Sequence, residues 1–501
     1  MADKKETEVY LKLVIDRNKK KVVFAEANSD FVDILFSFLT LPMGTIVRIL
    51  ANRSDPSSRK ANIGSFNNLY ASVSNLDTMY FVTKECRDVL LSTRSSAEVQ
   101  CRKLMINIDD VKPTQYFVCD LCIDKYKSGS YASLYVSTCS TVPCHHCQNF
   151  LKRAIDFDDD GESVFVAKTS SFVISDDLHV IPNNPTSTLG ILKSCGIKDF
   201  AALEEINTLK LGSSEIFHLL ECSFFSKNAL SDFYFGKKLK SVEVPTIEPS
   251  LRTECTGGAK KITFKVYVQK STNKILLAHC SEDFVNFLLS LLTVPLGKVI
   301  SLFPGDHESL NIEHIHQSVT KLNVGEYLKS QQLKDMLLYP KLLSQYFCPS
   351  HIFPLEEQNS LYKYLKRTST AGGRDFYSIS LDSTQSYKYL SDISPISKIG
   401  GGFVRGPTKF MVTDDLVVTP LSSMSCFAYL QELKVPLNDI EEQEIHFGMN
   451  EAVNLLWASL TSTSALSNGL KFFILKNPKQ ETSVNKPSAE RSGVKLEQGH
   501  F

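Results

Sequence analysis

One stretch of this sequence occurs twice, at residues 29–49 and again at 282–302. With a constant offset of 253 residues, the match extends without a gap from residues 11–50 to residues 264–303. The positions that are identical in the two copies are, in the first copy, Lys12, Lys21, Ala25, Asp30, Phe31, Val32, Leu35, Ser37, Leu39, Thr40, Pro42 and Gly44. Chance would give about two or three identities at average composition. A self-match of this length predicts an internal duplication.

The repeated stretch has the pattern of a β-hairpin followed by a buried helix. Leu11–Ile15 and Lys21–Ala25 are rich in β-formers and flank a polar turn, which is typical of a hairpin. Residues 31–41 are apolar on nearly every side, so they predict a core helix, and Pro42 ends it. Both copies of the helix should therefore be buried, at Phe31, Ile34, Leu35, Phe38, Leu39, Phe284, Phe287, Leu288 and Leu291.

A second repeated block links residues 165–182 to residues 403–420 at an offset of 238. Together the two blocks predict an α+β fold of two homologous tandem halves, each with small antiparallel hairpins or sheets packed against helices. The first half should span residues 8–240 and the second residues 261–475. Residues 241–260 are rich in Pro, Thr and Gly and predict a linker, and the polar tail 476–501 predicts disorder.

Charge and composition exclude several classes of protein. Lysine plus arginine equals aspartate plus glutamate at 55 each, so no overall field favours a nucleic acid or a membrane surface. The N-terminal decapeptide lacks the apolar core of a secretory signal, and the longest uncharged apolar runs, of 14 residues, are too short to cross a membrane. The 13 cysteines are therefore expected in the reducing cytosol or nucleus, as thiols or metal ligands.

Two cysteine pairs carry the sharpest chemical signal. Cys119 and Cys122 form one CxxC pair, and Cys144 and Cys147 form another. Two such pairs can hold one tetrahedral zinc, so residues 112–155 predict a zinc-ribbon-like loop with a single structural zinc. The 21 residues between the pairs slightly exceed the usual spacing. Substitute ligands lie close by in the sequence, at Cys139, His145 and His146.

Two alternatives to zinc are unligated thiols and a redox CxxC pair. We place the redox pair lower because Cys119 and Cys122 do not clearly open a helix after a strand. The second half has no cysteine opposite Cys144 or Cys147, so we expect it to lack the metal. A site present in one copy favours a structural role over shared catalysis.

Paired acids recur in the second block, at Asp176–Asp177 and at Asp414–Asp415. Such pairs can perform acid–base chemistry or hold a cation. Each pair, however, separates two β-rich runs, where a tight turn belongs and aspartate is favoured. We interpret them as structural turn acids that define the repeat.

Other candidate residues carry weaker signals. Residues 156–161 begin like an EF-hand loop, but Ala167 stands where the bidentate glutamate is required. His314 and His316 show no acidic or cysteine partner nearby in the sequence, and they are expected to be ordinary surface or core histidines. No recognised catalytic motif appears in a credible context, so the sequence identifies no catalytic residue.

The hairpin followed by FVDILFSFLTLPMGTIVRIL, the cysteine pairs and the FVISDDLHVIP block resemble the plant-specific family called domain of unknown function 674. The resemblance spans about residues 8–475. It implies a plant protein of duplicated architecture and brings no activity.

These observations favour a non-enzymatic intracellular protein, an interaction or scaffold module with one structural zinc. The alternative is an enzyme or small-molecule binder that uses the crevice between the halves, and histidines and acids from both halves would support it. A third possibility is nucleic-acid binding through the zinc loop, which the acidic residues 156–160 oppose. A protein partner is possible, no membrane is expected, and the sequence leaves the oligomeric state open.

Overall fold

We describe the protein from a computed structural model, which covers residues 8–52, 63–127, 134–157, 164–236, 261–303, 310–346, 352–358, 362–368, 375–380, 388–392 and 402–475. It is an α+β protein with small antiparallel sheets and helices, as the sequence predicts. The linker 241–260, the tail 476–501 and most of the acidic loop 156–161 lie outside the described residues. None of the described helices is long and apolar enough to cross a membrane.

The first five-stranded sheet has the order β7-β6-β2-β1-β8, and every neighbouring pair is antiparallel. Its strands are β1 (Val9–Asp16), β2 (Lys21–Asn28), β6 (Ser171–Ser175), β7 (Val180–Pro182) and β8 (Leu203–Leu211). Along β1 the side chains alternate between the core and solvent, as the period of a half-buried strand requires. The predicted hairpin is therefore the centre of a larger sheet.

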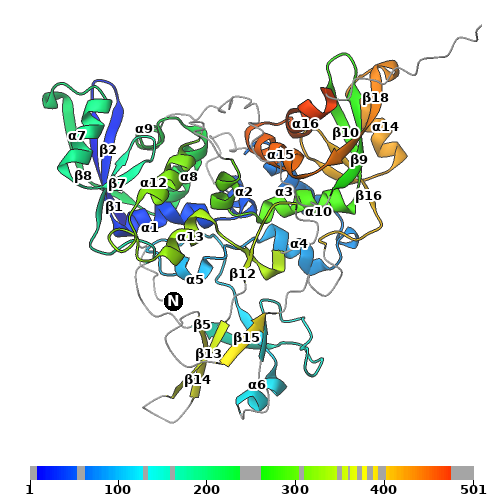
Figure 1. The fold of residues 1–501 in the computed structure, drawn as a ribbon, viewed down its shortest axis with the longest axis horizontal. Coiled ribbons are helices and arrows are strands. Elements are labelled where there is room, and N and C mark those ends of the chain that lie inside the picture. Colours follow the sequence, from blue (N-terminus) through cyan, green and yellow to red (C-terminus); the bar gives the residue numbers. More distant parts are fainter. Residues whose placement is uncertain are drawn as a thin grey trace, which may run out of the picture.

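The second sheet has the order β17-β16-β10-β9-β18, again wholly antiparallel. Its strands are β9 (Ile262–Gln269), β10 (Lys274–Ser281), β16 (Lys409–Thr413), β17 (Val418–Pro420) and β18 (Ile440–Phe447). Taken by position in the chain, its strands follow the same order as those of the first sheet. The two sheets lie at opposite ends of the molecule (Figure 1).

Each hairpin leads directly into the predicted core helix. In the first copy these elements are α1 (Ser29–Ser37), η1 (Phe38–Thr40) and α2 (Met43–Ala51), and in the second α10 (Glu282–Ser290), η4 (Leu291–Thr293) and α11 (Leu296–Ser301). The side chain of Asn28 accepts a hydrogen bond from the Phe31 N–H and so caps α1. All nine predicted core positions are at most 1% exposed, which confirms that these helices are buried.

The two proline turns meet each other at the centre of the molecule. The Met43 N–H donates to the Val294 carbonyl at 3.0 Å, and the Leu296 N–H donates to the Leu41 carbonyl at 2.9 Å. These two bonds are reciprocal, because each joins equivalent positions of the two repeats. The seam between the repeats is therefore built from the most similar part of the sequence.

Two helices cross this seam and pack on the opposite sheet. They are α3 (Phe66–Asn75), which contacts β17, and α12 (Asn311–Lys321), which contacts β7. Ser72 of α3 accepts a hydrogen bond from the Val418 N–H at 2.9 Å, and Ser318 of α12 accepts one from the Val180 N–H at the same distance. Each helix thus packs on the sheet that contains the other copy of the repeated hairpin, an arrangement that we call exchanged, and one continuous hydrophobic core includes residues of both sheets.

The remaining helices surround this core. In the first repeat they are η2 (Thr78–Tyr80), α4 (Lys84–Leu91), α5 (Glu98–Cys101), α7 (Pro185–Ser194), η3 (Phe200–Ala202), α8 (Ser213–Phe225) and α9 (Ala229–Phe235). In the second they are α13 (Gln331–Leu338), η5 (Ser344–Tyr346), α14 (Ser423–Glu432), η6 (Leu437–Asp439), α15 (Met449–Thr461) and α16 (Ala465–Leu475).

The middle segments of the two repeats combine into one closed barrel with the order β13-β14-β5-β3-β4-β15. The first repeat supplies β3 (Tyr116–Val118), β4 (Leu134–Ser137) and β5 (Arg153–Phe157), and the second supplies β13 (Tyr362–Thr368), β14 (Asp375–Ser380) and β15 (Lys388–Asp392). Two parallel contacts, β14 with β5 and β15 with β4, join the contributions. The barrel projects from the side of the molecule, below the two sheets in Figure 1.

A short sequence identity between the two halves of the chain does not correspond to equivalent structure. Residues 115–117 match residues 345–347 in sequence, yet Tyr116 lies in β3 while Tyr346 ends the short helix η5. Tyr346 is fully buried, and its hydroxyl accepts a hydrogen bond from the Arg94 N–H at 2.6 Å. The short parallel pair β11 (Leu342–Leu343) and β12 (Glu357–Gln358) also lies in this region.

Candidate metal centre

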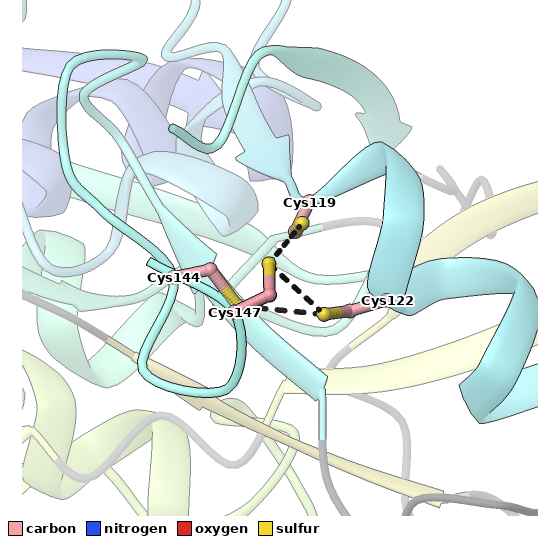
Figure 2. A group of neighbouring side chains, drawn as sticks. All are labelled: Cys119, Cys122, Cys144 and Cys147. Atoms are coloured by element: carbon pink, nitrogen blue, oxygen red, sulfur yellow. Dashed lines mark hydrogen bonds between the residues drawn. The ribbon is translucent and has the colours of Figure 1, made fainter. Parts of the chain in front are cut away.

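The four predicted cysteine ligands come together beside the barrel. Cys119 directly follows β3, and Cys122 lies in the first turn of α6 (Asp120–Lys127). Cys144 and Cys147 lie in the loop between β4 and β5. Figure 2 shows all four side chains pointing toward a common centre.

Main-chain hydrogen bonds shape both cysteine loops. The Ile123 N–H donates to the Cys119 carbonyl at 3.0 Å, which closes the first loop at the start of α6. In the second loop the Cys144 N–H donates to the Asn149 carbonyl at 2.7 Å, and the Gln148 N–H returns to the Cys144 carbonyl at 2.8 Å. Gln148 adopts a positive φ of 61°, which lets the loop close tightly. Each CxxC pair therefore presents both sulfurs on one side of a tight turn.

The sulfur positions match the edges of a tetrahedron. Cys147 Sγ lies 3.4 Å from Cys119 Sγ and 3.5 Å from Cys122 Sγ, and Cys144 Sγ lies 3.7 Å from Cys122 Sγ. All four sulfurs lie within 4.8 Å of one another. Zinc–sulfur bonds of about 2.3 Å give tetrahedral edges of about 3.8 Å. A single zinc-sized ion therefore fits the four thiols.

The reserve ligands lie outside this group. The Cys139 thiol contacts the Thr141 hydroxyl at 3.0 Å. The rings of His145 and His146 pack against Tyr135, with centroids 4.8 and 4.9 Å away. Among the described residues, the cysteine group that could hold an ion contains only Cys119, Cys122, Cys144 and Cys147.

The reason for placing a redox role lower was wrong, because Cys119 and Cys122 do open a helix after a strand. The sequence hid this because β3 has only three residues and α6 begins immediately after Cys119. The second pair now separates the hypotheses: Cys147 Sγ approaches both Cys119 and Cys122 within 3.5 Å. Four converging thiols are typical of a structural metal site, whereas a redox pair needs only two.

Burial and contacts between the thiols shift the pKa values of the clustered cysteines. Burial raises the pKa of the Cys122 thiol well above its usual range, and the neighbouring thiols raise it further. Burial acts in the same direction on Cys147, but hydrogen bonds from Asn149 and from the Cys119 thiol outweigh it and lower the pKa of Cys147 to about 7. Cys119, Cys122 and Cys144 are at most 1% exposed. Because the charged thiolate is the form that binds metal, a cation would offset the cost of burying them.

The paired acids lie in turns that follow β6 and β16, and they divide into two roles. Asp176 is buried and accepts hydrogen bonds from the Ser231 N–H at 2.7 Å and the Ser231 hydroxyl at 2.9 Å. Asp414 accepts the equivalent bond from the Ser467 N–H at 2.8 Å. Burial raises the pKa of both carboxyls. The first acid of each pair thus anchors the start of the final helix of its repeat.

The second acids are more exposed and have different neighbours. Asp415 accepts a hydrogen bond from Asn68 of α3 at 2.9 Å, whereas Asp177 lies beside His179 and His314. Sequence reasoning found no acidic partner near His314 in the sequence, and the structure shows one at Asp177. This partner lies more than a hundred residues away on the other repeat, where local spacing carries no signal.

Sequence reasoning also missed Asp33 and Asn286. Asp33 Oδ1 accepts hydrogen bonds from the Phe165 and Val166 N–H groups, and Oδ2 accepts one from Val164. Asn286 accepts from the Phe403 and Val404 N–H groups at the equivalent place. These residues sit at matched positions of the repeated helices, which was the available signal.

Comparison with known proteins gives one match. The family described as "Protein of unknown function (DUF674)" matches residues 5–450. No curated protein and no solved structure matches the chain. Because the match covers most of the 501 residues, the chain belongs to the DUF674 family of proteins of unknown function.

Proposed function

We propose that this chain is a non-enzymatic interaction or scaffold protein, built as two homologous tandem halves and stapled by one structural zinc. Support for the duplication comes from the matching strand orders and from the reciprocal contacts at the seam. The exchanged helices make the arrangement resemble a domain-swapped dimer within one chain. The first half comprises residues 8–240, with the zinc-ribbon-like segment at 112–155, and the second comprises residues 261–475.

The single observation that carries the proposal is the convergence of Cys119, Cys122, Cys144 and Cys147 on one point. Four thiolates fill the coordination sphere of a tetrahedral zinc, so such a site leaves no position for a reacting water or substrate. The ion would tie the start of α6 to the loop between β4 and β5. Its contribution is therefore to the folding of the barrel.

An interaction role is supported by an apolar face on α14. Met424 and Phe427, one helical turn apart, are 76% and 62% exposed. In the first repeat the equivalent helix α7 buries Ile191 and Leu192 over the outer face of its sheet, whereas α14 has no fully buried residue. We propose that the apolar face of α14 contacts a protein partner. A plant origin and a location in the cytosol or nucleus stay predictions of the sequence.

The zinc is tested by elemental analysis of the purified full chain. Cys144→Ser should lose one equivalent of zinc relative to the wild type and lower the thermal midpoint, because removal of one thiolate opens the site. Cys139→Ser is the matched control and should keep both the zinc content and the thermal midpoint of the wild type. Equal zinc content in wild type and Cys144→Ser would contradict the structural zinc.

The interaction role is tested by capture from source tissue and reconstitution. Leu189 lies on the equivalent helix α7 and is 50% exposed, so Leu189→Ser serves as the control. A partner identified with the wild type should bind the purified wild-type chain and this control with equal affinity. It should bind the double variant Met424→Ser, Phe427→Ser at least tenfold more weakly, since buried apolar anchors dominate such interfaces. Unchanged affinity in the double variant would exclude this face as the contact.

A second candidate, an enzyme or small-molecule binder at the junction of the halves, is favoured by one observation. Asp177 and His179 of the first half meet His314 of the second, which is the combination of acids and histidines that this hypothesis requires. A described cavity near the seam, lined in part by Leu41, Arg94 and Asp109, has a volume of only about 20 Å³. That is room for about one water molecule. If the purified chain turns over a substrate, loss of that turnover in the variant His314→Asn would favour this candidate over the scaffold role.

A further inference from the structure

A second group of metal-binding side chains lies where the exchanged helix α12 meets the first sheet. Asp177 belongs to the turn after β6, His179 precedes β7, and His314 projects from α12. One ligand atom from each residue lies within 4.8 Å of the other two. The group therefore combines a carboxylate and an imidazole from the first repeat with an imidazole from the second.

Each imidazole lies about one ligand-to-ligand distance from one oxygen of the same carboxylate. Asp177 Oδ1 lies 3.2 Å from His179 Nδ1, and Asp177 Oδ2 lies 3.6 Å from His314 Nδ1. Zinc bonds to nitrogen and oxygen of about 2.0–2.2 Å give tetrahedral edges of about 3.3–3.6 Å. The imidazole rings stack with centroids 4.0 Å apart, so both lie beside the same carboxylate, and rotation of the rings out of this stack would turn a nitrogen of each toward one ion.

The surrounding structure holds the three side chains in place. The Asp177 carboxylate accepts a hydrogen bond from the Ser175 hydroxyl, and the His314 ring lies 2.7 Å, through Nδ1, from the Asp177 carbonyl oxygen. Binding through this nitrogen would replace that hydrogen bond and move its proton to the other ring nitrogen in the alternative neutral tautomer. The side chains of His314, His179 and Asp177 are 12%, 32% and 40% exposed, so an ion can reach them from solvent.

The other repeat provides an internal comparison. The equivalent turn carries Asp415, but Asn68 stands in place of His314 and Val417 in place of His179. The amide of Asn68 donates to the Asp415 carboxylate at 2.9 Å and to its carbonyl at 3.0 Å. An amide thus makes this helix-to-turn contact without an imidazole. Packing of the two repeats therefore does not require the histidines.

We propose that Asp177, His179 and His314 bind a divalent transition-metal ion of the zinc, cobalt or nickel class. Two imidazoles and one carboxylate suit these ions, whereas calcium and magnesium prefer oxygen ligands only. Three protein ligands leave at least one coordination position open to water or another ligand. The bound ion would link the first sheet to α12, and so it would stabilise the contact between the two repeats.

The experiment is titration of the purified full chain, with zinc in its cysteine site, by Co²⁺. One further equivalent should bind and give the d–d absorption of a nitrogen- and oxygen-ligated ion, without the thiolate-to-cobalt charge transfer of a cysteine site. His314→Asn and His179→Val recreate the residues of the other repeat. Each should weaken cobalt binding at least tenfold, because one of three ligands is lost. Both variants should keep the wild-type circular dichroism spectrum.

A gain-of-site variant separates this proposal from non-specific binding. Asn68→His combined with Val417→His should create a second site of the same spectrum in the other repeat. Binding that is unchanged in His314→Asn, or that occurs only at millimolar cobalt, marks an adventitious ion only and overturns the proposal. Absence of binding in the wild type also overturns it. Charge-transfer absorption would appear only if cobalt entered the cysteine site, and the zinc content of the same sample reports that site independently. Failure of the second site is therefore distinguishable from failure of the structural zinc.

Discussion

Asp33 and Asn286 hold the same piece of main chain by different chemistry. Both lie on the repeated core helix and accept backbone N–H groups of the segment before β6 or β16. Asp33 is 3% exposed, and burial raises its pKa to about 6 despite the three N–H donors. At neutral pH the anchor at Asp33 is therefore a buried negative charge, whereas the anchor at Asn286 is neutral.

The variant Asp33→Asn should make stability less dependent on pH. An unfolded aspartate has a pKa of about 3.9, so the folded chain binds more protons between about pH 4 and 6. This raised folded-state pKa stabilises the fold at low pH, and that contribution is lost as pH rises through about 6. Through this titration the free energy of unfolding should fall by roughly 3 kcal/mol as the pH rises from acidic to neutral. Asp33→Asn should remove this pH dependence.

Chemical denaturation at about pH 4.5 and 7 should show about 2 kcal/mol of this total. Asn286→Asp is the reciprocal control and should add a dependence of the same sign. The comparison between variants matters because Asp109, whose pKa burial also raises to about 6, contributes in the same direction. Equal pH dependence in the wild type and Asp33→Asn would show that Asp33 is not the source.

Asp176→Ala should destabilise the chain through a lost anchor. The substitution leaves the N–H of Ser231, which is 1% exposed, without its 2.7 Å acceptor. An unsatisfied buried donor costs about 1–3 kcal/mol. The matched change Asp414→Ala should have a similar cost, measured as the free energy of unfolding in denaturant. Losses below about 0.5 kcal/mol in both would mean that water replaces the carboxylate.

At the scale of elements, the sequence predicted the hairpins and core helices because their signals are local. The β-rich run Leu11–Ile15 and the apolar run 31–41 each predict one element without knowledge of the rest. The exchange of α3 and α12 could not be predicted this way. When two sheets present similar surfaces, a helix can pack on either of them. The length and path of the connecting chain then determine on which sheet it packs. The barrel was hidden for a related reason, since its parallel contacts join β5 and β14, more than two hundred residues apart.

Phe31→Ala tests the core helix. The side chain is 1% exposed and belongs to the core shared by both repeats. Removal of a buried phenylalanine should cost about 3–5 kcal/mol, from lost burial and from the cavity left behind. Phe284→Ala is the matched change in the second repeat. Urea denaturation measures both, and a loss below about 1 kcal/mol would show that α1 does not carry the core.

At the scale of the whole molecule, spacing alone was enough to select four cysteines that the structure brings together. It could not find the cluster at Asp177, because His314 reaches it from the other repeat. Short-range ligand pairs are visible in a sequence when each loop supplies two ligands. A site assembled from a turn and a distant helix depends on the tertiary fold, which local spacing does not encode.

Isolated halves should fail to fold as monomers. Residues 8–240 alone lack α12 against β7, and residues 261–475 alone lack α3 against β17. Each would expose the face that its missing helix covers. Size-exclusion chromatography with light scattering should find either unfolded chains or homodimers that restore the exchange between two copies. Stable, cooperatively folding monomers of either half would contradict the exchanged arrangement.

The position of α12 along the chain also sets an order of events during translation. The place on β7 that α12 covers is synthesised well over a hundred residues before α12 itself. At typical elongation rates of about 5–20 residues per second, the first sheet emerges from the ribosome on the order of 10 s before its covering helix. During that interval an apolar surface stays open to chaperones or to another nascent chain. Neighbouring ribosomes on one messenger RNA would therefore favour packing of α12 from one nascent chain on β7 of another, unless α12 of the same chain reaches β7 first.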